Sequence, residues 1–449
     1  MVARSRKYLI RGGKLIDSNG VRIAELLVDD GKIEAIEQRI DPPRGCVEID
    51  ARDLVVSPGF VDLHTHLRQP GNERSETILS GSLAGVLGGY TALLAMPNTS
   101  PPIDSPEVVS YVKELSREAL LDVYFAGAIT KGRNGESLVE MGKLAELGIR
   151  LFTDDGNGVQ DAQLMRRALE YARGIGVTLA QHCEDLSLAN GGAVNEGAVS
   201  SVLGLRGIPN AAEDVMVARD IELVRLTGAR MHFLHISTSR SAELVRWAKR
   251  DGMPITAEVT PHHLVLSEKN ISGYNPIFKV NPPLRSEADR SALWSALNED
   301  VFDAIATDHA PHHVEAKETT FDQAAFGMIG LQTALGAVLG EMNRSLSLSD
   351  GETLVAGGIS DEQLMHLVGL LTSRPARIAG ISDVHGGPLV EGRPANIAIF
   401  DPQLKWRLSE SEIVSRSKNS PYLGVDLTGR VLYTIVNGEL KLREGELCL

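Results

Sequence analysis

The sequence predicts an α/β fold, a closed (β/α)8 TIM-like barrel with a small composite β-sandwich domain formed by the N- and C-terminal segments. Three observations predict it. Short apolar runs alternate with helical segments through the middle of the chain, which is the pattern of repeated βα units on a parallel sheet. Eight such units span about 250 residues, the usual size of a (β/α)8 barrel. The two ends of the chain show short strands and turns, with too few strands at either end for an independent sheet.

Residues 1–57 and 386–449 are therefore expected to pair into one composite β-domain, with the barrel, residues 58–385, inserted between them. A lone hairpin is marginal in water, so each end needs the other to bury an apolar face. The turn at Asn437-Gly438 is typical of such strand connections. The strands predicted at the two ends are Tyr8–Ile16, Ala24–Val28, Lys32–Ile36, Ala395–Phe400 and Val431–Val436.

The barrel is predicted to contain eight strands separated by helices. Two helix starts are recognisable: Ser105 precedes Pro106 at the first helical position, and Ser286 with Asp289 resembles a capping box. An open doubly wound sheet is the competing fold, but no Gly-rich phosphate turn follows the first strand, so the barrel is favoured. The predicted barrel strands are Val61–His64, Thr91–Met96, Val123–Ala128, Ile149–Thr153, Val177–Ala180, Met231–Leu234, Ile255–Val259 and Ala304–Ala306.

The composition is that of a folded globular protein, with 43% hydrophobic and 23% charged residues. The formal net charge of -14 opposes binding to nucleic-acid phosphates and to anionic membrane surfaces, so neither partner is expected. The 3 cysteines stand far apart, which leaves no disulfide framework and no Cys-based zinc motif. The apolar run at residues 8–10 is too short for a signal peptide, and no run reaches the length of a transmembrane helix. A cytoplasmic location in a reducing compartment is expected.

Histidines and carboxylates gather where the predicted barrel strands end. The reacting groups of barrel enzymes lie at that face, because the carboxyl ends of parallel strands converge there. Ten of the 12 histidines fall between positions 64 and 313. We therefore expect one site from residues that are far apart in the chain. The runs that follow the strands are His64–Arg68, Met96–Thr99, Thr153–Gly156, Gln181–Glu184, His235–Ser237, Thr260–His263 and Thr307–His312.

Imidazole nitrogens and carboxylate oxygens without thiolates suit zinc or a similar divalent ion in a hydrolytic site. His64 and His66 share one face of a strand because alternate residues point the same way, so both can bind one ion. Asp308 ends the last strand, which lies beside the first when the barrel closes, so it can complete the shell of that ion.

A second ion is expected between His182 and His235, which end the adjacent fifth and sixth strands. Asp155, from the fourth strand, is the natural bridge between the two ions. Each of these residues has a more ordinary interpretation when taken alone. A single His-x-His is usually a surface or core pair, Asp154-Asp155-Gly156 is typical of a turn, and His182 suits a buried polar residue. Their joint occurrence in barrel order favours the metal site.

The remaining histidines are not predicted to be ligands. His262 and His263 follow a proline and are interpreted as the end of a strand, while the run Glu315–Glu318 is interpreted as mostly a solvated face. The histidines taken as structural are His232, His313, His366 and His385.

The motifs at the strand ends resemble the cyclic-amide branch of the amidohydrolase superfamily, and within it the type I dihydroorotase family of bacteria. The resemblance runs from about residue 8 to about residue 440, and the last three motifs in this order are specific to that family and its close relatives. The motifs are Pro58–Arg68, Met96–Thr99, Thr153–Gly156, Thr256–His263, Asn281–Arg285 and Ala306–His312.

The resemblance implies a zinc enzyme that interconverts dihydroorotate and N-carbamoyl-L-aspartate in pyrimidine biosynthesis. As a mechanism we expect two Zn2+ ions bridged by Asp155 and by a hydroxide that attacks the ring amide, with Asp308 as the proton shuttle. Asp155 rather than Asp154 matches the family, because it stands 27 residues before His182. The metal ligands that the resemblance implies are His64, His66, Asp155, His182, His235 and Asp308.

The resemblance also implies a set of substrate contacts. Arg68 offers a planar fork that can bind the substrate carboxylate with two parallel hydrogen bonds. One departure from the family pattern is Ala325, at a position where proline is expected. The implied substrate contacts are Arg68, Asn98, Asn281, His312 and the backbone at Phe326-Gly327.

Two alternatives are open at this point. Hydantoinases, dihydropyrimidinases and allantoinases use a carboxylated lysine on the fourth strand, where this chain has Asp154-Asp155 and no lysine. A catalytically inactive scaffold for aspartate transcarbamoylase is the other alternative, and the filled ligand positions argue against it. A homo-oligomer, a dimer or higher, is expected, and an active enzyme is also compatible with association with aspartate transcarbamoylase.

Overall fold

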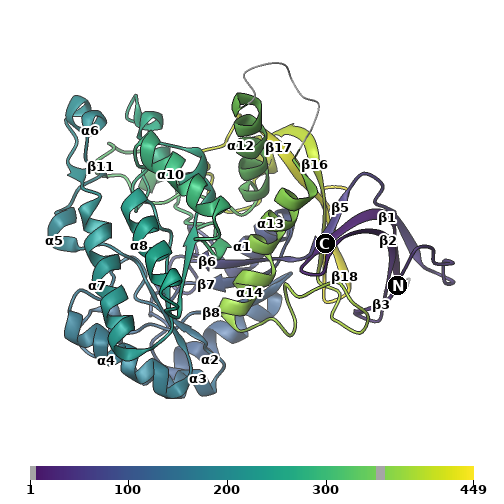
Figure 1. Cartoon of the computed structure of the whole chain (residues 1–449), viewed down its shortest axis with the longest axis horizontal. Helices are drawn as coiled ribbons and strands as arrows, with labels where there is room; N and C mark the ends of the chain where they lie inside the picture. Colours follow the sequence, from purple (N-terminus) through teal and green to yellow (C-terminus); the bar gives the residue numbers. More distant parts are fainter. Residues whose placement is uncertain (1–6, 350–358, 449) are drawn as a thin grey trace.

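The computed structural model describes residues 7–349 and 359–448. Residues 1–6, 350–358 and 449, which fall inside the predicted domain ranges, lie outside the described residues. The middle of the chain forms a barrel of parallel strands, with helices packed around it (Figure 1). The barrel strands are β6 (Phe60–Thr65), β7 (Tyr90–Ala95), β8 (Asp122–Phe125), β9 (Leu151–Phe152), β10 (Thr178–Gln181), β13 (Met231–Phe233), β14 (Ile255–Val259) and β15 (Ala304–Ile305).

The barrel closes through two parallel bridges between its strand ends. Strands β6, β7 and β8 pair in that order, and β9, β10, β13, β14 and β15 pair in a second run. Gly127 bridges to Phe152 and so joins β8 to β9, while Thr65 bridges to His309 and so joins β6 to the segment after β15. Each predicted barrel strand overlaps an observed one, and the predicted (β/α)8 fold is confirmed.

The helices between the barrel strands begin where local sequence directs them. Ser105 accepts a hydrogen bond from the amide of Val108, with Pro106 at the first helical position, as predicted. Ser286 caps its helix, but the carboxylate of Asp289 accepts from the Ser286 hydroxyl and from the amide of Ser239, so it does not complete a capping box. The longer helices are α1 (Ile78–Leu87), α2 (Pro106–Leu115), α3 (Met141–Glu146), α4 (Ala162–Ile175), α7 (Ala211–Thr227), α8 (Ser239–Arg250), α10 (Glu287–Asn298), α12 (Ala334–Ser349), α13 (Asp361–Leu371) and α14 (Ser373–Ala379).

Short elements lie in the loops above the carboxyl ends of the strands. None of the helices in the described ranges is long and apolar enough to cross a membrane. The short elements are α5 (Leu186–Ala189), β11 (Val194–Asn195), α6 (Ala198–Leu203), β12 (Gly207–Ile208), α9 (Pro261–Val265) and α11 (Val314–Lys317).

The two ends of the chain form one nine-stranded sheet, visible in Figure 1 as purple and yellow strands side by side. Strand β5 pairs in parallel with β1 on one side and antiparallel with β16 on the other, with Val56 opposite Ile399. The expected pairing of the two ends is thus present, while the boundaries at 57/58 and 385/386 stay predictions. The strands are β1 (Tyr8–Asp17), β2 (Gly20–Asp29), β3 (Lys32–Glu37), β4 (Val47–Asp50), β5 (Val55–Pro58), β16 (Ile397–Arg407), β17 (Asp426–Val436), β18 (Glu439–Arg443) and β19 (Glu446–Leu447).

The composite sheet packs against the first barrel strand. Phe60, which opens β6, lies with its ring centroid 6.0 Å from that of Phe400 on β16 and 5.7 Å from that of Tyr90 on β7. All three rings are buried. Because β5 runs into β6 with one residue between them, the sheet and this aromatic contact fix the start of the strand that carries His64.

Candidate active site

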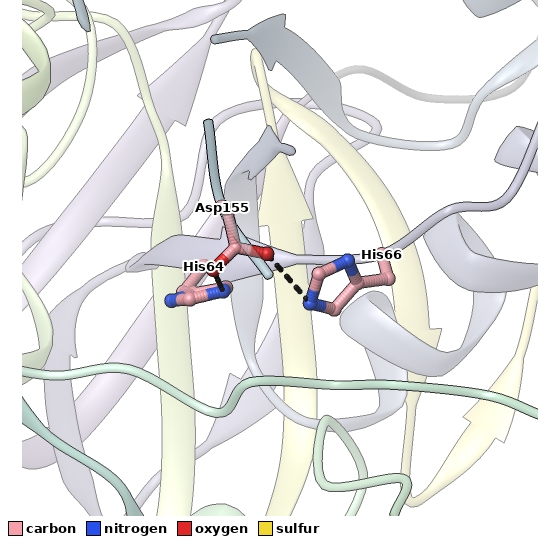
Figure 2. A group of neighbouring side chains, drawn as sticks. All are labelled: His64, His66 and Asp155. Carbon is pink, nitrogen blue, oxygen red and sulfur yellow. Dashed lines mark ion pairs between the residues drawn. The ribbon is translucent and has the colours of Figure 1, made fainter. Parts of the chain in front are cut away.

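His64 and His66 face one carboxylate at the carboxyl end of β6. Figure 2 shows the two rings on either side of Asp155, which follows β9. The Nε2 atom of His64 lies 3.4 Å from Oδ1 of Asp155, and Nε2 of His66 lies 3.5 Å from its Oδ2. The predicted pairing of these histidines on one face is therefore present in the structure.

His182 and His235 meet the same carboxylate from the other side. They follow β10 and β13, and Nδ1 of His182 lies 2.9 Å from Nε2 of His235. Both nitrogens lie close to Oδ1 of Asp155, at 3.5 Å and 3.7 Å. Asp155 thus stands between two histidine pairs contributed by three different strands.

Asp308 completes the cluster from the last strand. Its Oδ1 atom lies 3.0 Å from Nε2 of His66 and 3.6 Å from Nε2 of His64. Asp308 has a φ of 46°, and His235 and Arg68 also have positive φ values, which side chains other than glycine rarely adopt. Three residues of one site in this backbone conformation indicate that the fold holds their side chains in place at some conformational cost.

Several ligand atoms in the cluster have no hydrogen-bond partner. Two of them, Nε2 of His64 and Oδ1 of Asp155, face the inside of the cluster; the third, Nδ1 of His235, is on the side of the ring away from Asp155, and all three are buried. Buried polar atoms are normally paired, so this group indicates a missing partner. Two sets of ligand atoms lie within 4.8 Å of one another, one from His64, His66 and Asp155 and the other from Asp155, His182 and His235. The donor set and its spacing fit two cations that share Asp155.

Both carboxyl groups of the cluster are held as carboxylates. Burial alone would raise the pKa of Asp155, but the histidines around it, His64 first, lower that pKa well below its ordinary value. Burial is likewise outweighed at Asp308, where His64 and His66 lower the pKa. Two ionised carboxylates among four imidazoles supply the negative charge that a divalent cation requires.

Glu258 orients the cluster through its contacts with histidine rings. It is not predicted from the sequence as a site residue. Its Oε1 atom accepts a hydrogen bond from Nδ1 of His64 at 2.8 Å, and its Oε2 atom accepts from Nε2 of His232 at 3.0 Å. Burial would raise the pKa of Glu258, but His232 and His64 bring it down to about 2. The bond to Nδ1 leaves the Nε2 lone pair of His64 free to face Asp155, as in the carboxylate–histidine pairs that orient metal ligands.

A sequence signal for Glu258 exists. Glu258 and Thr256 are two residues apart on β14, so their side chains point to the same face of the strand, toward the barrel interior. An acidic residue at such a position needs a specific partner. His232, predicted to be structural, is held between Thr256, at 2.8 Å from its Nδ1, and Glu258.

Arg133, which is also not predicted from the sequence, follows β8 and donates to the backbone carbonyl of Asp155.

Asp154, the neighbour of Asp155 in the chain, binds backbone amides and not the histidines. Asp154 accepts hydrogen bonds from the amides of Ile129 and Thr130, at 2.8 Å and 3.1 Å, and so turns away from the histidines. His263 lies between Thr260 and the carbonyl of Pro282, at 2.8 Å and 3.0 Å. Four other histidines contact groups outside the cluster: His309 contacts Glu76, His313 contacts Glu315, His366 contacts the carbonyl of Leu297, and His385 contacts Asp122 and Thr91. The Nε2 atom of His262 is buried without a hydrogen-bond partner.

One cavity of about 220 Å³ opens onto the cluster. Every predicted substrate contact lines it, together with five of the six predicted ligands, while His64 lies beneath its floor. Gly327 has a φ of 137°, and a Cβ atom there would lie 2.7 Å from the Cβ of Ala310, so glycine is required at this point of the wall. The lining residues named in the predictions are Arg68, Asn98, Asn281, His312, Phe326 and Gly327, with His66, Asp155, His182, His235 and Asp308.

Arg68 places an unpaired positive charge in this cavity. Its Nε atom donates to the carbonyl of Pro311 at 3.1 Å, and its Nη2 atom lies 3.4 Å from Nε2 of His312. Burial lowers the pKa of Arg68 to about 10, which leaves it charged at neutral pH. Within residues 7–349 and 359–448, no carboxylate lies at ion-pair distance from its guanidinium. A half-buried guanidinium with no carboxylate at ion-pair distance favours an anionic ligand.

The amide side chains of the cavity hold the histidines as well as line the wall. Asn98 accepts from Nδ1 of His66 at 3.0 Å and donates to Asp155 at 3.3 Å. Asn281 lies with its Nδ2 atom 3.4 Å from Nε2 of His182, while its Oδ1 atom is buried without a partner. The free oxygen of Asn281 is available to a donor on a bound molecule.

A barrel that gathers imidazoles and carboxylates at the carboxyl ends of its strands, around a cavity with a free guanidinium, defines a hydrolase of the amidohydrolase class. Solved structures of that class share the fold. The L-hydantoinase (dihydropyrimidinase) of Arthrobacter aurescens superposes with a TM-score of 0.86 at 24% identity, covering 98% of this chain and 97% of its own. The dihydropyrimidinase of Brevibacillus agri NCHU1002 gives a TM-score of 0.84 at 21% identity, covering 98% and 96%. At such identities the likeness concerns the fold.

Comparison of sequences places the chain in a narrower group of proteins than the fold does. The Dihydro-orotase-like family model matches residues 53–241. The protein named dihydroorotase in Geobacter sp. strain M21 is 44% identical, covering 97% of this chain and 99% of its own length. The dihydroorotase of Anaeromyxobacter dehalogenans strain 2CP-C is 45% identical, covering 97% and 98%. The chain belongs to the dihydroorotase family.

The geometry around Glu258 predicts an effect on metal affinity. Glu258→Gln leaves one oxygen to accept from two histidine rings, so His64 loses its fixed orientation. We expect the affinity for Zn2+ to fall about 10–100-fold, measured by competition with a fluorescent chelator. Glu318→Gln, at an exposed position, is the matched control and should bind Zn2+ as the unchanged protein does. Equal affinities in the two variants would show that Glu258 does not orient the cluster.

Proposed function

We propose that this protein is a zinc-dependent dihydroorotase, which opens the ring of dihydroorotate to N-carbamoyl-L-aspartate and closes it again. One observation carries the proposal: two histidine–carboxylate groups that share Asp155 line the same cavity as the unpaired guanidinium of Arg68. The first arrangement suits hydrolysis of an unactivated amide, and the second suits a substrate that carries a carboxylate. Membership of the dihydroorotase family supports both.

The ligand set supports zinc. His64, His66 and Asp308 would hold one ion, His182 and His235 the other, and Asp155 both. Nitrogen and oxygen donors without thiolates are the ligands of catalytic zinc sites. When bound, such ions supply the Lewis acidity and the activated water that amide hydrolysis needs at neutral pH.

Asp308 is the residue we assign to proton transfer. It is a carboxylate at the cavity wall, 3.0 Å from His66, with a second oxygen available for the proton. Asp308 accepts the proton from the attacking water and returns it to the ring nitrogen, which becomes strongly basic as the C–N bond breaks. In the reverse direction the same carboxylate removes the proton from the carbamoyl nitrogen.

Arg68 binds the substrate carboxylate and thereby sets which way the ring enters the cavity. The Arg68 side chain is half-buried and already anchored through Nε to the carbonyl of Pro311, so little side-chain freedom is lost when the substrate binds. Asn281 contributes a free amide oxygen, and His312 stands against the carbonyl of Phe326 at 2.7 Å. A neutral hydantoin ring would leave the charge of Arg68 without a partner.

The function is tested by assaying the purified protein in both directions. We expect zinc-loaded protein to hydrolyse dihydroorotate and to cyclise N-carbamoyl-L-aspartate, and not to hydrolyse an uncharged hydantoin. Removal of metal with dipicolinate should abolish both activities, and Zn2+ should restore them. Metal analysis should find two equivalents per chain, because two ligand groups share Asp155. Hydantoin turnover without dihydroorotate turnover would contradict the proposal.

Arg68→Lys tests the role of the guanidinium. Lysine keeps the charge but loses the planar fork, so we expect KM for dihydroorotate to rise about 10–100-fold while zinc content stays unchanged. Steady-state kinetics and metal analysis on the same preparation provide the measurement. A parallel loss of zinc and activity would assign Arg68 to the metal site instead.

Asp308→Ala separates proton transfer from metal binding. His64, His66, Asp155, His182 and His235 remain, so we expect at least one bound metal per chain. Turnover should fall about 10²–10⁴-fold in both directions, as expected for loss of a general acid–base group. Asp154→Asn is the control, since Asp154 binds backbone amides and its loss should lower the melting temperature and keep the activity. Near-normal rates in Asp308→Ala would remove Asp308 from the mechanism.

We also propose that the reaction belongs to pyrimidine biosynthesis, which the proposed chemistry and the family membership support. The cytoplasmic location, the homo-oligomer and the association with aspartate transcarbamoylase stay predictions. The three cysteines, Cys46, Cys183 and Cys448, are free thiols, which supports a reducing compartment.

A further inference from the structure

The loop between His312 and Phe326 contains a buried lysine that the proposed mechanism does not use. Lys317 ends the short helix α11 and is only 4% exposed, although the run Glu315–Glu318 was interpreted as mostly a solvated face. That interpretation is wrong for Lys317, because the helix turns this one side chain inward while Glu315 and Glu318 remain exposed.

The Lys317 ammonium is surrounded by backbone carbonyls. Its Nζ atom donates to the carbonyls of Pro276 and Lys279, both at 3.0 Å, and of Ala325 at 2.7 Å. An ammonium has three N–H donors and no acceptor, so three carbonyl oxygens match it in number. In the part of the chain that the structure describes, no carboxylate lies at ion-pair distance from Nζ. Burial and the charge of Lys279 lower the pKa of Lys317 to about 7.

The three carbonyls belong to two segments that end in cavity residues. Pro276 and Lys279 lead to Asn281, while Ala325 precedes Phe326 and Gly327. A backbone hydrogen bond from the amide of Gly327 to the carbonyl of Lys279, at 2.9 Å, joins the same two segments. The Lys317 ammonium therefore links the segment that leads to Asn281 with the segment that leads to Phe326 and Gly327, and both segments contribute to the cavity wall.

Ala325, at the position where the family pattern has proline, also helps to hold this loop. The amide of Ala325 donates to the carbonyl of Ala316 at 2.9 Å, a bond that a proline at this position would lack. Lys279 adds a further contact, with its Nζ atom 2.8 Å from the carbonyl of Asp322 and 4.4 Å from the ring centroid of Phe326. The loop is held both by buried cations against carbonyl oxygens and by Phe321, which packs in a small apolar cluster with Ile271 and Phe278.

We propose that Lys317 is a positioning residue for substrate binding, which fixes the loop carrying Phe326 and Gly327 against the segment carrying Asn281. This rests on the proposed function of the cavity. Lys317 touches neither the histidine cluster nor the cavity lining, so the contacts that carry its effect are those with the backbone that it holds. Its charge also acts on His312, whose pKa is lowered by burial and, in part, by this charge. A wall that is already in place before the substrate arrives lowers the ordering cost of binding.

Lys317→Met tests this with a side chain of similar length and no donors. The full-length, zinc-loaded protein is compared with Lys269→Met, an exposed lysine on the neighbouring segment. Hydrogen exchange followed by mass spectrometry should show at least tenfold faster exchange of peptides covering residues 276–281 and 314–327, with β6 and β14 unchanged. The control should exchange as the unchanged protein does.

Kinetics provide the second measurement. We expect KM for dihydroorotate to rise at least tenfold in Lys317→Met, with kcat within threefold and zinc content unchanged. A loss of kcat with KM unchanged, or faster exchange throughout the protein, would overturn the proposal and leave Lys317 a general stability residue. If Lys317→Met is insoluble, Lys317→Gln, which keeps two N–H donors, should show the same changes in smaller measure. Hydrogen exchange is measured without substrate turnover. If the unsubstituted protein proved inactive, the proposed function would be refuted, and the exchange data would still test whether Lys317 fixes the loop.

Discussion

The Asp155 carboxylate is the interaction on which the site depends. Four imidazoles from three strands lie within 3.7 Å of its two oxygens, and every one of these rings is buried. A carboxylate in such surroundings is stable only when cations or hydrogen-bond donors compensate its charge. Some of the buried atoms in the cluster still have no hydrogen-bond partner. The cluster is therefore compatible with a cation held among its side chains.

Buried carboxylates also hold the framework of this site together. Asp62, on the first barrel strand, accepts from the amide of His64 and from the amide of Thr307, both at 3.1 Å, and so ties the first strand to the last. Burial raises the pKa of Asp62 to about 7. Glu258 orients two histidine rings, and Asp154 binds the loop after the third strand. Each acid sits where a strand end needs its backbone or ring donors satisfied.

Much of the fold and of the cluster could be predicted because the barrel imposes a simple rule. Parallel strands end at one rim, so the residues that follow them meet whatever their distance in sequence. His182 and His235 were placed together on that rule, and the structure brings their nitrogens to 2.9 Å. The choice of Asp155 over Asp154 came from the family resemblance, and the backbone bonds of Asp154 give it a physical reason.

What could not be predicted depends on the direction of single side chains and on loop paths. Glu258 lies in a recognised motif, but its two bonds to histidines depend on where β13 and β14 stand relative to β6. Lys317 looks like a surface charge among other charges until the loop is folded over it. Neither hydrophobic periodicity nor strand-end position carries that information. Such residues are found from contacts rather than from patterns.

The pairing of β5 with β16 has a consequence for how the chain is made. Residues 55–58 emerge from the ribosome more than 300 residues before their partner strand, residues 397–407. Until then one side of β5 is an open edge of unsatisfied backbone groups, directly before the strand that carries the first histidines. A nascent chain is thus exposed to mispairing and to chaperone binding at β5 until β16 has been synthesised.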